Sequence, residues 1–130
     1  MPLVRIDLVK GRSKEFRETV ASVVYDAMID ILKAPEDDRF QIITQHAPED
    51  HIADETYLGI RRSKACIFIQ IFLLAGRSVE QKQRFYKKVA QGLQSRLGHR
   101  PEDVFIGLVE VARENWSFGN GEAQYAEAAS

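Results

Sequence analysis

The sequence predicts one α/β domain of two tandem β-α-β units, which together form a four-stranded mixed sheet with two helices on one face. The order strand, helix, strand occurs twice, over residues of about 2–46 and 65–111. Short motifs recur at equivalent points with a period of 65 to 66 residues: Gly-Arg-Ser at 11–13 and 76–78, and Pro-Glu-Asp at 35–37 and 101–103. The length of 130 residues suits a single domain, residues 1–130, with one core. Parallel strands joined by right-handed crossovers are the simplest account of each unit.

The first predicted strand opens the chain and places Pro2 on the same face as Val4, Ile6 and Leu8, because side chains alternate along a strand. Removal of Met1, which a small second residue favours, frees the Pro2 amine. The unperturbed pKa of an α-amino group is about 7.7–8.0, so this amine is able to act as a base or as an acid. Position alone also allows a structural explanation, in which proline begins the strand because its missing N–H does no harm there.

The helix of the first unit is predicted by apolar residues at spacings of three and four, which fall on one helical face. They are Phe16, Val20, Val23, Val24, Ala27, Met28, Ile31 and Leu32. Ser13 is the expected N-cap, and the helix is expected to end before Pro35, because the residue before a proline avoids the α region. The alternating run from Arg39 to His46 then predicts the second strand.

The second unit repeats this order, with a strand at Ala65–Leu74, a helix that carries Leu97 near its end and a strand at Val104–Val111. The strand at Ala65–Leu74 is apolar at nearly every position, so both of its faces must be covered. Two helices cover only one face of so small a sheet. We therefore expect the other face to meet another subunit.

Two segments lie outside the repeats. The connection Ala47–Lys64 is long for a compact domain, and such loops are usually functional or interfacial. The C-terminal arm, residues 113–125, is rich in large aromatic side chains, including Trp116, Phe118 and Tyr125. We expect the arm to pack across a pocket or against a neighbouring subunit.

The composition excludes several classes of function. The 18 basic and 19 acidic side chains are interspersed and leave a net charge of −1, so neither nucleic acid nor a membrane surface is an expected partner. The longest apolar run is too short to cross a bilayer and no signal peptide is evident, which predicts a cytoplasmic protein. Cys66, the only cysteine, lies within that run, so we expect a packed thiol and no internal disulfide.

The two units differ at positions of chemical interest. Pro2 aligns with Ile67, so only the first unit presents a terminal amine. Asp38 aligns with Val104, an apolar strand position, so the carboxylate at 38 departs from the repeat. Its structural explanation is that residues between a helix and a strand are often acidic.

Other polar residues predict weaker sites. Arg12 and Arg77 align with each other, and each precedes a helix, where a guanidinium and main-chain N–H groups together suit an anion; a solvated cation near a turn is the structural alternative. His99 follows a predicted helix end, where its positive charge is favourable. No metal is expected, because the candidate ligands do not have the spacing of a zinc site. These candidates are His46, Glu49, Asp50 and His51.

Four stretches of the chain share a pattern with a known family: Pro2-Leu3, Asp38-Arg39-Phe40-Gln41, Ala75-Gly76-Arg77-Ser78, and the arm motif Trp116-Ser117-Phe118-Gly119-Asn120-Gly121-Glu122-Ala123-Gln124-Tyr125. With these motifs on two β-α-β units, the chain resembles the tautomerase superfamily, whose founding members are 4-oxalocrotonate tautomerase and macrophage migration inhibitory factor. It is most similar to the malonate semialdehyde decarboxylase branch. The resemblance spans almost the whole chain, and the arm motif is its most specific part.

The resemblance implies the tautomerase fold, a homotrimer and a small oxo-carboxylate substrate, and we expect no cofactor. It assigns Pro2 as the catalytic acid or base, Arg77 as the residue that binds the substrate carboxylate, and Asp38 as the residue that activates or orients water. It also assigns aromatic residues of the arm to the substrate pocket: Trp116, Phe118 and Tyr125. One position departs from the pattern, since some decarboxylases of this branch carry a second arginine where this chain has Ala75.

Two activities remain open for Pro2. As a cation it would polarise the carbonyl of a 3-oxo acid or protonate its product carbanion, which is the decarboxylase chemistry that we expect, with tautomerase activity as a side reaction. As a neutral base it would move a proton between the carbon and oxygen ends of an enol, as in keto-enol tautomerisation of the phenylpyruvate type. The non-enzymatic alternative is a trimeric interaction module in which Pro2, Asp38 and Arg77 are incidental.

Overall fold

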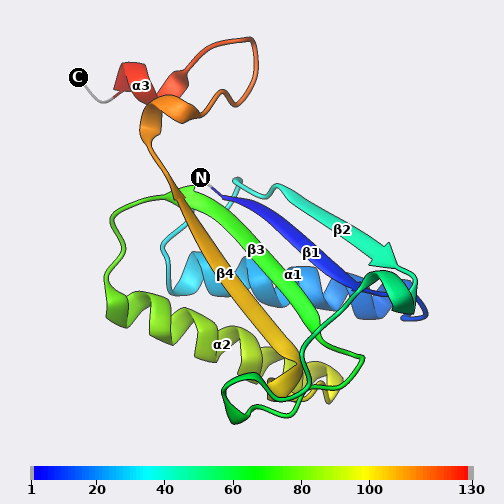
Figure 1. Ribbon diagram of the computed structural model, residues 1–130. Helices are drawn as coiled ribbons and strands as arrows, with labels where there is room; N and C mark the ends of the chain where they lie inside the picture. The colour runs from blue at the N-terminus through cyan, green and yellow to red at the C-terminus, as the bar shows by residue number, and fades with distance from the viewer. Residues whose placement is uncertain (1, 129–130) are drawn as a thin grey trace.

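The structure, a computed structural model, describes residues 2–128; Met1, whose removal the sequence predicts, and residues 129–130 lie outside this range. Four strands and two long helices form the body of the described chain, and a five-residue helix lies near its C-terminal end (Figure 1). In chain order they are β1 (Leu3–Val9), α1 (Lys14–Asp30), β2 (Gln41–His46), β3 (Ile67–Leu74), α2 (Val79–Leu97), β4 (Val104–Val111) and α3 (Gln124–Ala128).

The four strands form one mixed sheet in the order β2-β1-β3-β4. Strands β1 and β2 are parallel, as are β3 and β4, and each parallel pair is connected through one of the long helices (Figure 1). The two units meet in the middle of the sheet, where β1 and β3 run antiparallel with Ile6 opposite Ile69. The predicted pair of β-α-β units with a mixed sheet is therefore confirmed.

The Gly-Arg-Ser motif forms the turn from strand to helix in both units. Ser13 Oγ accepts a hydrogen bond from the N–H of Phe16 at 3.0 Å, which confirms the predicted N-cap of α1. Ser78 Oγ accepts from the N–H of Gln81 at 3.1 Å, and the Gln81 side chain accepts in return from the N–H of Ser78, also at 3.1 Å. This reciprocal pair satisfies two N–H groups that the first turn of α2 would otherwise leave without partners.

Two predicted strands begin later than the sequence pattern indicates. Strand β2 begins at Gln41, two residues after the predicted start, and β3 begins at Ile67, also two residues late. The shortening of β3 has a local cause, because the N–H groups of Ala65 and Cys66 donate to the Oγ and the carbonyl of Ser63, at 3.1 and 3.4 Å. These N–H groups close a turn and are not part of the sheet.

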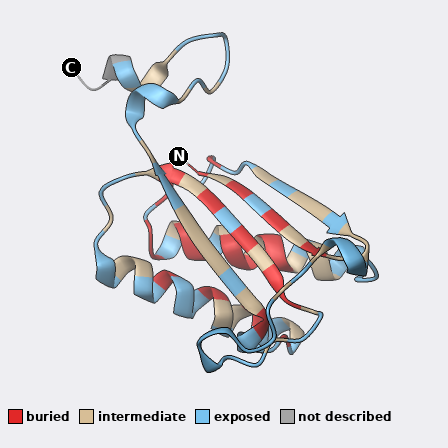
Figure 2. Cartoon of the chain, viewed as in Figure 1, coloured by how far each residue is buried: buried red, intermediate tan, exposed pale blue. Residues whose placement is uncertain are grey.

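Helices α1 and α2 both pack on one face of the sheet, and the core lies between them and that face (Figure 2). Alternate residues of β1 and β3 point into it, and fully burying a large aliphatic side chain contributes about 1.5–3 kcal/mol. The two helices approach closely at Gly92, where a Cβ atom would lie 2.8 Å from Cγ1 of Val23. The buried strand residues are Val4, Ile6, Leu8, Ile67, Ile69, Ile71 and Leu73.

The opposite face of the sheet has no helix over it (Figure 2). Apolar side chains on this face remain open to solvent: Phe105 is 49% exposed, Ile42 42% and Val109 37%, and Phe68 and Phe72 are half-buried. The expectation that two helices cover only one face is confirmed. An uncovered group of large apolar side chains is typical of a surface that another protein chain covers.

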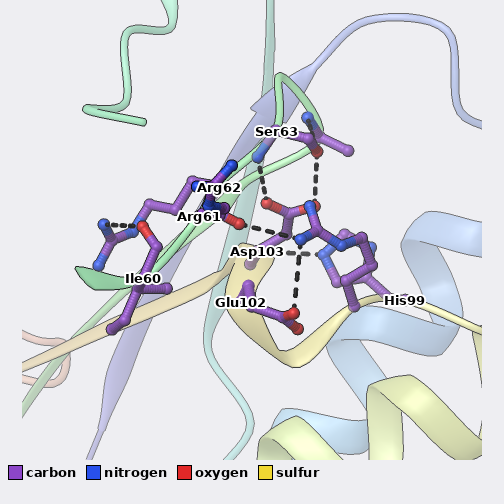
Figure 3. A network of polar contacts seen from close by, with 9 residues as sticks. Ile60, Arg61, Arg62, Ser63, His99, Glu102 and Asp103 are labelled. Carbon is purple, nitrogen blue, oxygen red and sulfur yellow. Dashed lines mark hydrogen bonds and ion pairs between the residues drawn. The ribbon is translucent and has the colours of Figure 1, made fainter. Parts of the chain in front are cut away.

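A buried carboxylate attaches the long connection to the start of β4 (Figure 3). Asp103 is 1% exposed, and its two oxygens accept from the N–H and Oγ of Ser63 at 2.7 and 2.6 Å. Arg100 Nη1 also donates to Asp103, at 3.3 Å. Burial alone would raise the pKa of Asp103, but the hydrogen bonds from Ser63 and the nearby charge of Arg100 outweigh it and hold the pKa below its ordinary value.

His99 and Cys66 are both buried. His99 is 5% exposed and its Nε2 donates to the carbonyl of Asp103 at 3.0 Å, so its ring is part of the packed structure, whereas the sequence predicted a charge at a helix end. Cys66 is fully buried, as predicted, and burial raises the pKa of its thiol to about 11.

In the described part of the chain, no helix has both the length and the apolar character to cross a membrane.

Candidate active site

The predicted site residues gather at one end of the sheet because of the strand directions. Strands β1 and β2 begin at the end where β3 and β4 finish, since β1 and β3 are antiparallel. Pro2 directly precedes β1, Asp38 lies shortly before β2, and Arg77 follows β3. The C-terminal arm leaves the sheet from the end of β4 and rises above this same end, close to the N-terminus (Figure 1).

Pro2 and Asp38 line the same small cavity. Pro2 is buried, Asp38 is 5% exposed, and the space left between them and α1 is about 10 Å³, on the order of one water molecule. The remaining lining residues come from β1, α1, the segment between α1 and β2, and the first position of β2: Val4, Tyr25, Met28, Ala34, Arg39, Phe40 and Gln41. The structure therefore brings together a chain-end proline and a carboxylate that stand far apart in the sequence.

Tyr25 of α1 holds the segment that carries Asp38. Its hydroxyl donates to the carbonyl of Glu36, and the guanidinium of Arg39 lies over its ring, 4.5 Å from the centroid. Tyr25 was not among the predicted site residues. The available signal was a phenol placed among the apolar residues of the helix, one turn before Met28.

Burial dominates the electrostatics of Asp38. It raises the pKa of this carboxyl above its ordinary value, because the charged form loses solvation, and the like charge of Asp37 adds to the increase. Tyr125 of the arm also has a raised pKa, first because it is partly buried and second because of the negative charge of Asp38. The arm thus lies within electrostatic reach of this carboxylate.

Arg77 is held in place by main-chain carbonyls. Its Nε and Nη2 donate to the carbonyl of Leu32 at 3.2 and 3.0 Å, and its Nη1 donates to that of Leu74 at 3.1 Å. These bonds fix a half-buried positive charge and leave further N–H groups for a ligand. Arg77 forms no ion pair with the side chains that the structure describes, and it does not line the Pro2 cavity.

The three aromatic residues of the arm pack on one another. The rings of Trp116 and Phe118 stack with centroids 5.4 Å apart, and Phe118 meets the edge of Tyr125 at 4.9 Å. None of the three lines the Pro2 cavity among the described residues. Nε1 of Trp116 is buried and has no hydrogen-bond acceptor within the described chain, so it is a donor that a ligand or water is able to use.

The arm motif has a local structural reason. The side chain of Gln124 accepts from the N–H of Phe118 at 3.0 Å and donates to the carbonyl of Gly119 at 2.8 Å, which closes the loop. Within this loop three successive residues have positive φ: Gly119 (142°), Asn120 (60°) and Gly121 (68°). Glycine and asparagine tolerate this conformation best, which explains their place in the motif.

The histidines of the metal alternative have protein partners. His46 Nε2 lies 2.6 Å from Oδ1 of Asp7, and His51 Nε2 donates to the carbonyl of Cys66 at 2.7 Å. The two rings stack with centroids 5.6 Å apart. Over the described residues, no three His, Cys, Asp or Glu side chains are grouped so as to hold a metal ion.

Comparison with known proteins gives consistent matches. Two family models, each described as tautomerase enzyme, match residues 38–119 and residues 2–61. The probable tautomerase YusQ of Bacillus subtilis (strain 168) is 40% identical over 127 residues, which cover 98% of this chain and all of the relative. The crystal structure of FG41 malonate semialdehyde decarboxylase inhibited by 3-bromopropiolate is 43% identical, with a TM-score of 0.90 and coverage of 98% of this chain and 97% of that one.

A more distant solved structure shares the fold alone. The Q0 fused 4-OT wild type, described as a symmetric trimer, is 22% identical to this chain. The match has a TM-score of 0.78 and covers 95% of this chain and 98% of the fused 4-OT chain. At this level of identity the likeness concerns the path of the backbone and not the chemistry.

Replacement of Tyr25 by phenylalanine tests how Asp38 is positioned. Removing one hydroxyl that donates to a main-chain carbonyl is expected to lower the free energy of unfolding by about 1 kcal/mol. It should also speed amide hydrogen exchange at Asp38, whose N–H donates to the carbonyl of Pro35 at 3.2 Å. Urea unfolding and exchange measured by NMR give the two values. Tyr57→Phe is the matched control, because Tyr57 is 61% exposed; equal effects of the two changes would contradict the assigned role of Tyr25.

Proposed function

The chain belongs to the tautomerase superfamily, and from this premise we propose that it is a cytoplasmic enzyme in which Pro2, freed by removal of Met1, acts on small oxo-carboxylates. The proposed reaction is decarboxylation of a 3-oxo acid of the malonate semialdehyde type, with keto-enol tautomerisation as a side activity. The observation that carries this proposal is the shared cavity of Pro2 and Asp38. The similarity to a malonate semialdehyde decarboxylase over nearly the whole chain supports it.

The choice between decarboxylase and tautomerase depends on the charge of Pro2. Burial beside Val4 disfavours the ammonium form and lowers its pKa, whereas an ionised carboxylate at Asp38 favours it and raises its pKa. A tenfold change in the acid dissociation constant of the amine corresponds to about 1.4 kcal/mol. The charged side chain that lies closer to the amine therefore decides whether Pro2 is a cation or neutral. Asp38 lines the cavity with Pro2 and Arg77 does not, which favours a cationic Pro2.

In the proposed reaction a cationic Pro2 polarises the carbonyl of the 3-oxo acid. The bond between the carboxylate carbon and the adjacent carbon breaks, and carbon dioxide leaves. The electron pair of the broken bond stays with the adjacent carbon and forms an enolate with the polarised carbonyl. Pro2 then supplies the proton that converts the enolate carbon to product, while Asp38 orients water or the departing carboxylate. Arg77, a fixed cation at the same end of the sheet, binds the substrate carboxylate.

The arm is proposed to close the substrate pocket from above. The arm rises above the end of the sheet that carries Pro2 (Figure 1), and it carries the aromatic cluster of Trp116, Phe118 and Tyr125. An apolar cover excludes water from the developing charge, and Nε1 of Trp116 supplies one donor.

The second candidate is a tautomerase without decarboxylase activity, of the phenylpyruvate type. Ala75 favours it, because this chain lacks a second cation beside Arg77, and the Bacillus relative is described as a probable tautomerase. In this mechanism Pro2 is neutral and serves as the base. The third candidate, a trimeric interaction module without activity, requires that Pro2 and Asp38 share a cavity by accident.

A homotrimer is part of the proposal. The open sheet face exposes Ile42, Phe105 and Val109, and burial of these side chains against other copies would remove apolar surface from water. The fused 4-OT with the same fold is described as a symmetric trimer. Sheet faces that meet at a threefold axis would cover the surface that α1 and α2 leave open.

The first functional prediction concerns Pro2. Protein whose intact mass shows that Met1 is absent should release carbon dioxide from malonate semialdehyde and should also tautomerise phenylpyruvate enol, and NMR titration should give a Pro2 pKa above its unperturbed value of about 7.7–8.0. Protein that retains Met1 should be inactive, because its Pro2 nitrogen is an amide. A Pro2 pKa well below neutrality without release of carbon dioxide would rule out the decarboxylase and support the tautomerase. If the processed protein turned over neither compound, the result would support the non-enzymatic interaction module.

The second prediction compares two arginines at equivalent points of the repeat. Arg77→Ala should reduce kcat/KM for a carboxylate substrate far more than Arg12→Ala does, because only Arg77 lies at the Pro2 end of the sheet. Loss of a charge-assisted hydrogen bond to a carboxylate corresponds to roughly a ten- to hundredfold decrease. Circular dichroism of both variants checks that they fold. Equal, small effects would mean that the substrate carboxylate binds elsewhere.

The third prediction concerns assembly. Sedimentation of the purified protein should give a mass of about three chains at micromolar concentration, because the open sheet face is too apolar to stay in water. Phe105→Lys should shift the protein towards monomer, whereas Tyr86→Lys, a change of similar size on α2, should not. A parent protein that is a stable monomer would refute the trimer.

A further inference from the structure

The internal repeat implies a second site at the opposite end of the sheet. A shift of 65 residues relates Pro2 to Ile67 and Arg12 to Arg77. Pro2 of the first unit and Arg77 of the second lie at the same end of the sheet, the proposed active end. Because β1 and β3 are antiparallel, the equivalent pair, Ile67 of the second unit and Arg12 of the first, must lie together at the other end.

The structure contains a cavity at this position. It has a volume of about 370 Å³, within the range of small-molecule sites, and both Arg12 and Ile67 line it. We call it the Arg12 cavity. Its other lining residues are Leu8, Val9, Lys10, Gly11, Phe16, Lys64 and Ala65.

The Arg12 cavity is positively charged. Lys10, Arg12 and Lys64 line it, and no carboxylate does. None of these three cations forms an ion pair with any side chain that the structure describes. Lys64 also borders a neighbouring cavity that Glu49 and Glu55 line, whereas Lys10 and Arg12 do not line that cavity. Three cations around one concave surface concentrate small anions there.

Arg12 differs from Arg77 in how its donors are used. Arg77 donates to two main-chain carbonyls, whereas the guanidinium of Arg12 makes no hydrogen bond within the described chain and lies over the ring of Phe16, 4.5 Å from the centroid. In the repeat, Phe16 takes the place of Gln81, whose side chain accepts a hydrogen bond from the N-cap Ser78 of α2. The aromatic ring orients the guanidinium and leaves its N–H groups for a ligand.

We propose that the Arg12 cavity binds a small carboxylate and does not transform it. Lys10, Arg12 and Lys64 hold the carboxylate, and the apolar side chains of Ile67 and Phe16 contact the rest of the molecule. Ile67 stands where the other site has Pro2, so no amine is present to move a proton. The existence of an anion site rests on the three cations, and the carboxylate class rests on the role proposed above for Arg77.

Malonate is the probe, and the main-chain N–H groups of Gly11 and Gly76 are matched reporters in NMR spectra of the ¹⁵N-labelled full chain. Addition of malonate should shift the Gly11 resonance in a saturable way, and potassium chloride at the same ionic strength should not. Arg12→Gln and Lys10→Gln should each weaken binding at Gly11 roughly ten- to hundredfold and leave the response of Gly76 as in the parent. Lys14→Gln is the control, since Lys14 is close in sequence but does not line the cavity.

The outcomes separate this proposal from the proposed function. Saturable shifts at Gly11 that Arg12→Gln weakens support the Arg12 cavity, even if the enzyme assays fail and Gly76 does not respond. An unchanged Gly11 resonance, an equal response to chloride, or unaltered affinity in Arg12→Gln would each overturn it, whatever the enzyme assays show. The unperturbed Gly76 resonance of each variant shows that it is folded.

Discussion

The antiparallel pairing of β1 with β3 is the constraint on which the rest of this structure depends. Each β-α-β unit alone has parallel strands and would place its chemical groups at separate ends of its own small sheet. Joined antiparallel, the units bring the start of the first to the end of the second. Pro2 and Asp38 thereby share an end of the sheet with Arg77 and the arm, and Arg12 shares the other end with Ile67.

The two faces of the sheet differ in burial, because helices cover one of them and not the other. Seven strand residues on the helix side are almost completely buried and form the core together with the apolar faces of α1 and α2. On the other side Phe105, Ile42 and Val109 stay exposed, although the long connection borders a cavity beside Phe105. A chain of this length has two helices to cover two faces, and both pack on the same one because right-handed crossovers put them there. The single chain therefore forms a packed core but leaves apolar side chains exposed on the open face of the sheet.

Asp38 illustrates the cost of burying a carboxylate in a small cavity. Burial raises its pKa and so works against the charged form. A cationic amine at Pro2 would work in the opposite direction and would favour two opposite charges over two neutral groups. With a free Pro2 amine the two groups would titrate as a pair, and the chemistry proposed for Pro2 would follow from the balance between burial and this attraction. Tyr25 contributes by fixing the segment in which Asp38 lies.

The sequence by itself determined the two β-α-β units, the mixed sheet, the Ser13 cap, the buried thiol of Cys66 and the family, because these depend on local periodicity and on motifs that repeat along the chain. Position in the chain and the internal repeat singled out Pro2, Asp38 and Arg77, and the resemblance assigned their roles. Only the tertiary structure decided which site residues share a cavity: Pro2 and Asp38 do, while Arg77 is bound to carbonyls and the aromatic arm packs on itself. Tyr25, the packed ring of His99 and the Arg12 cavity were also decided there. The physical reason is that burial, hydrogen-bond partners and the meeting of distant segments depend on how the strands pair across the sheet, which no local pattern specifies.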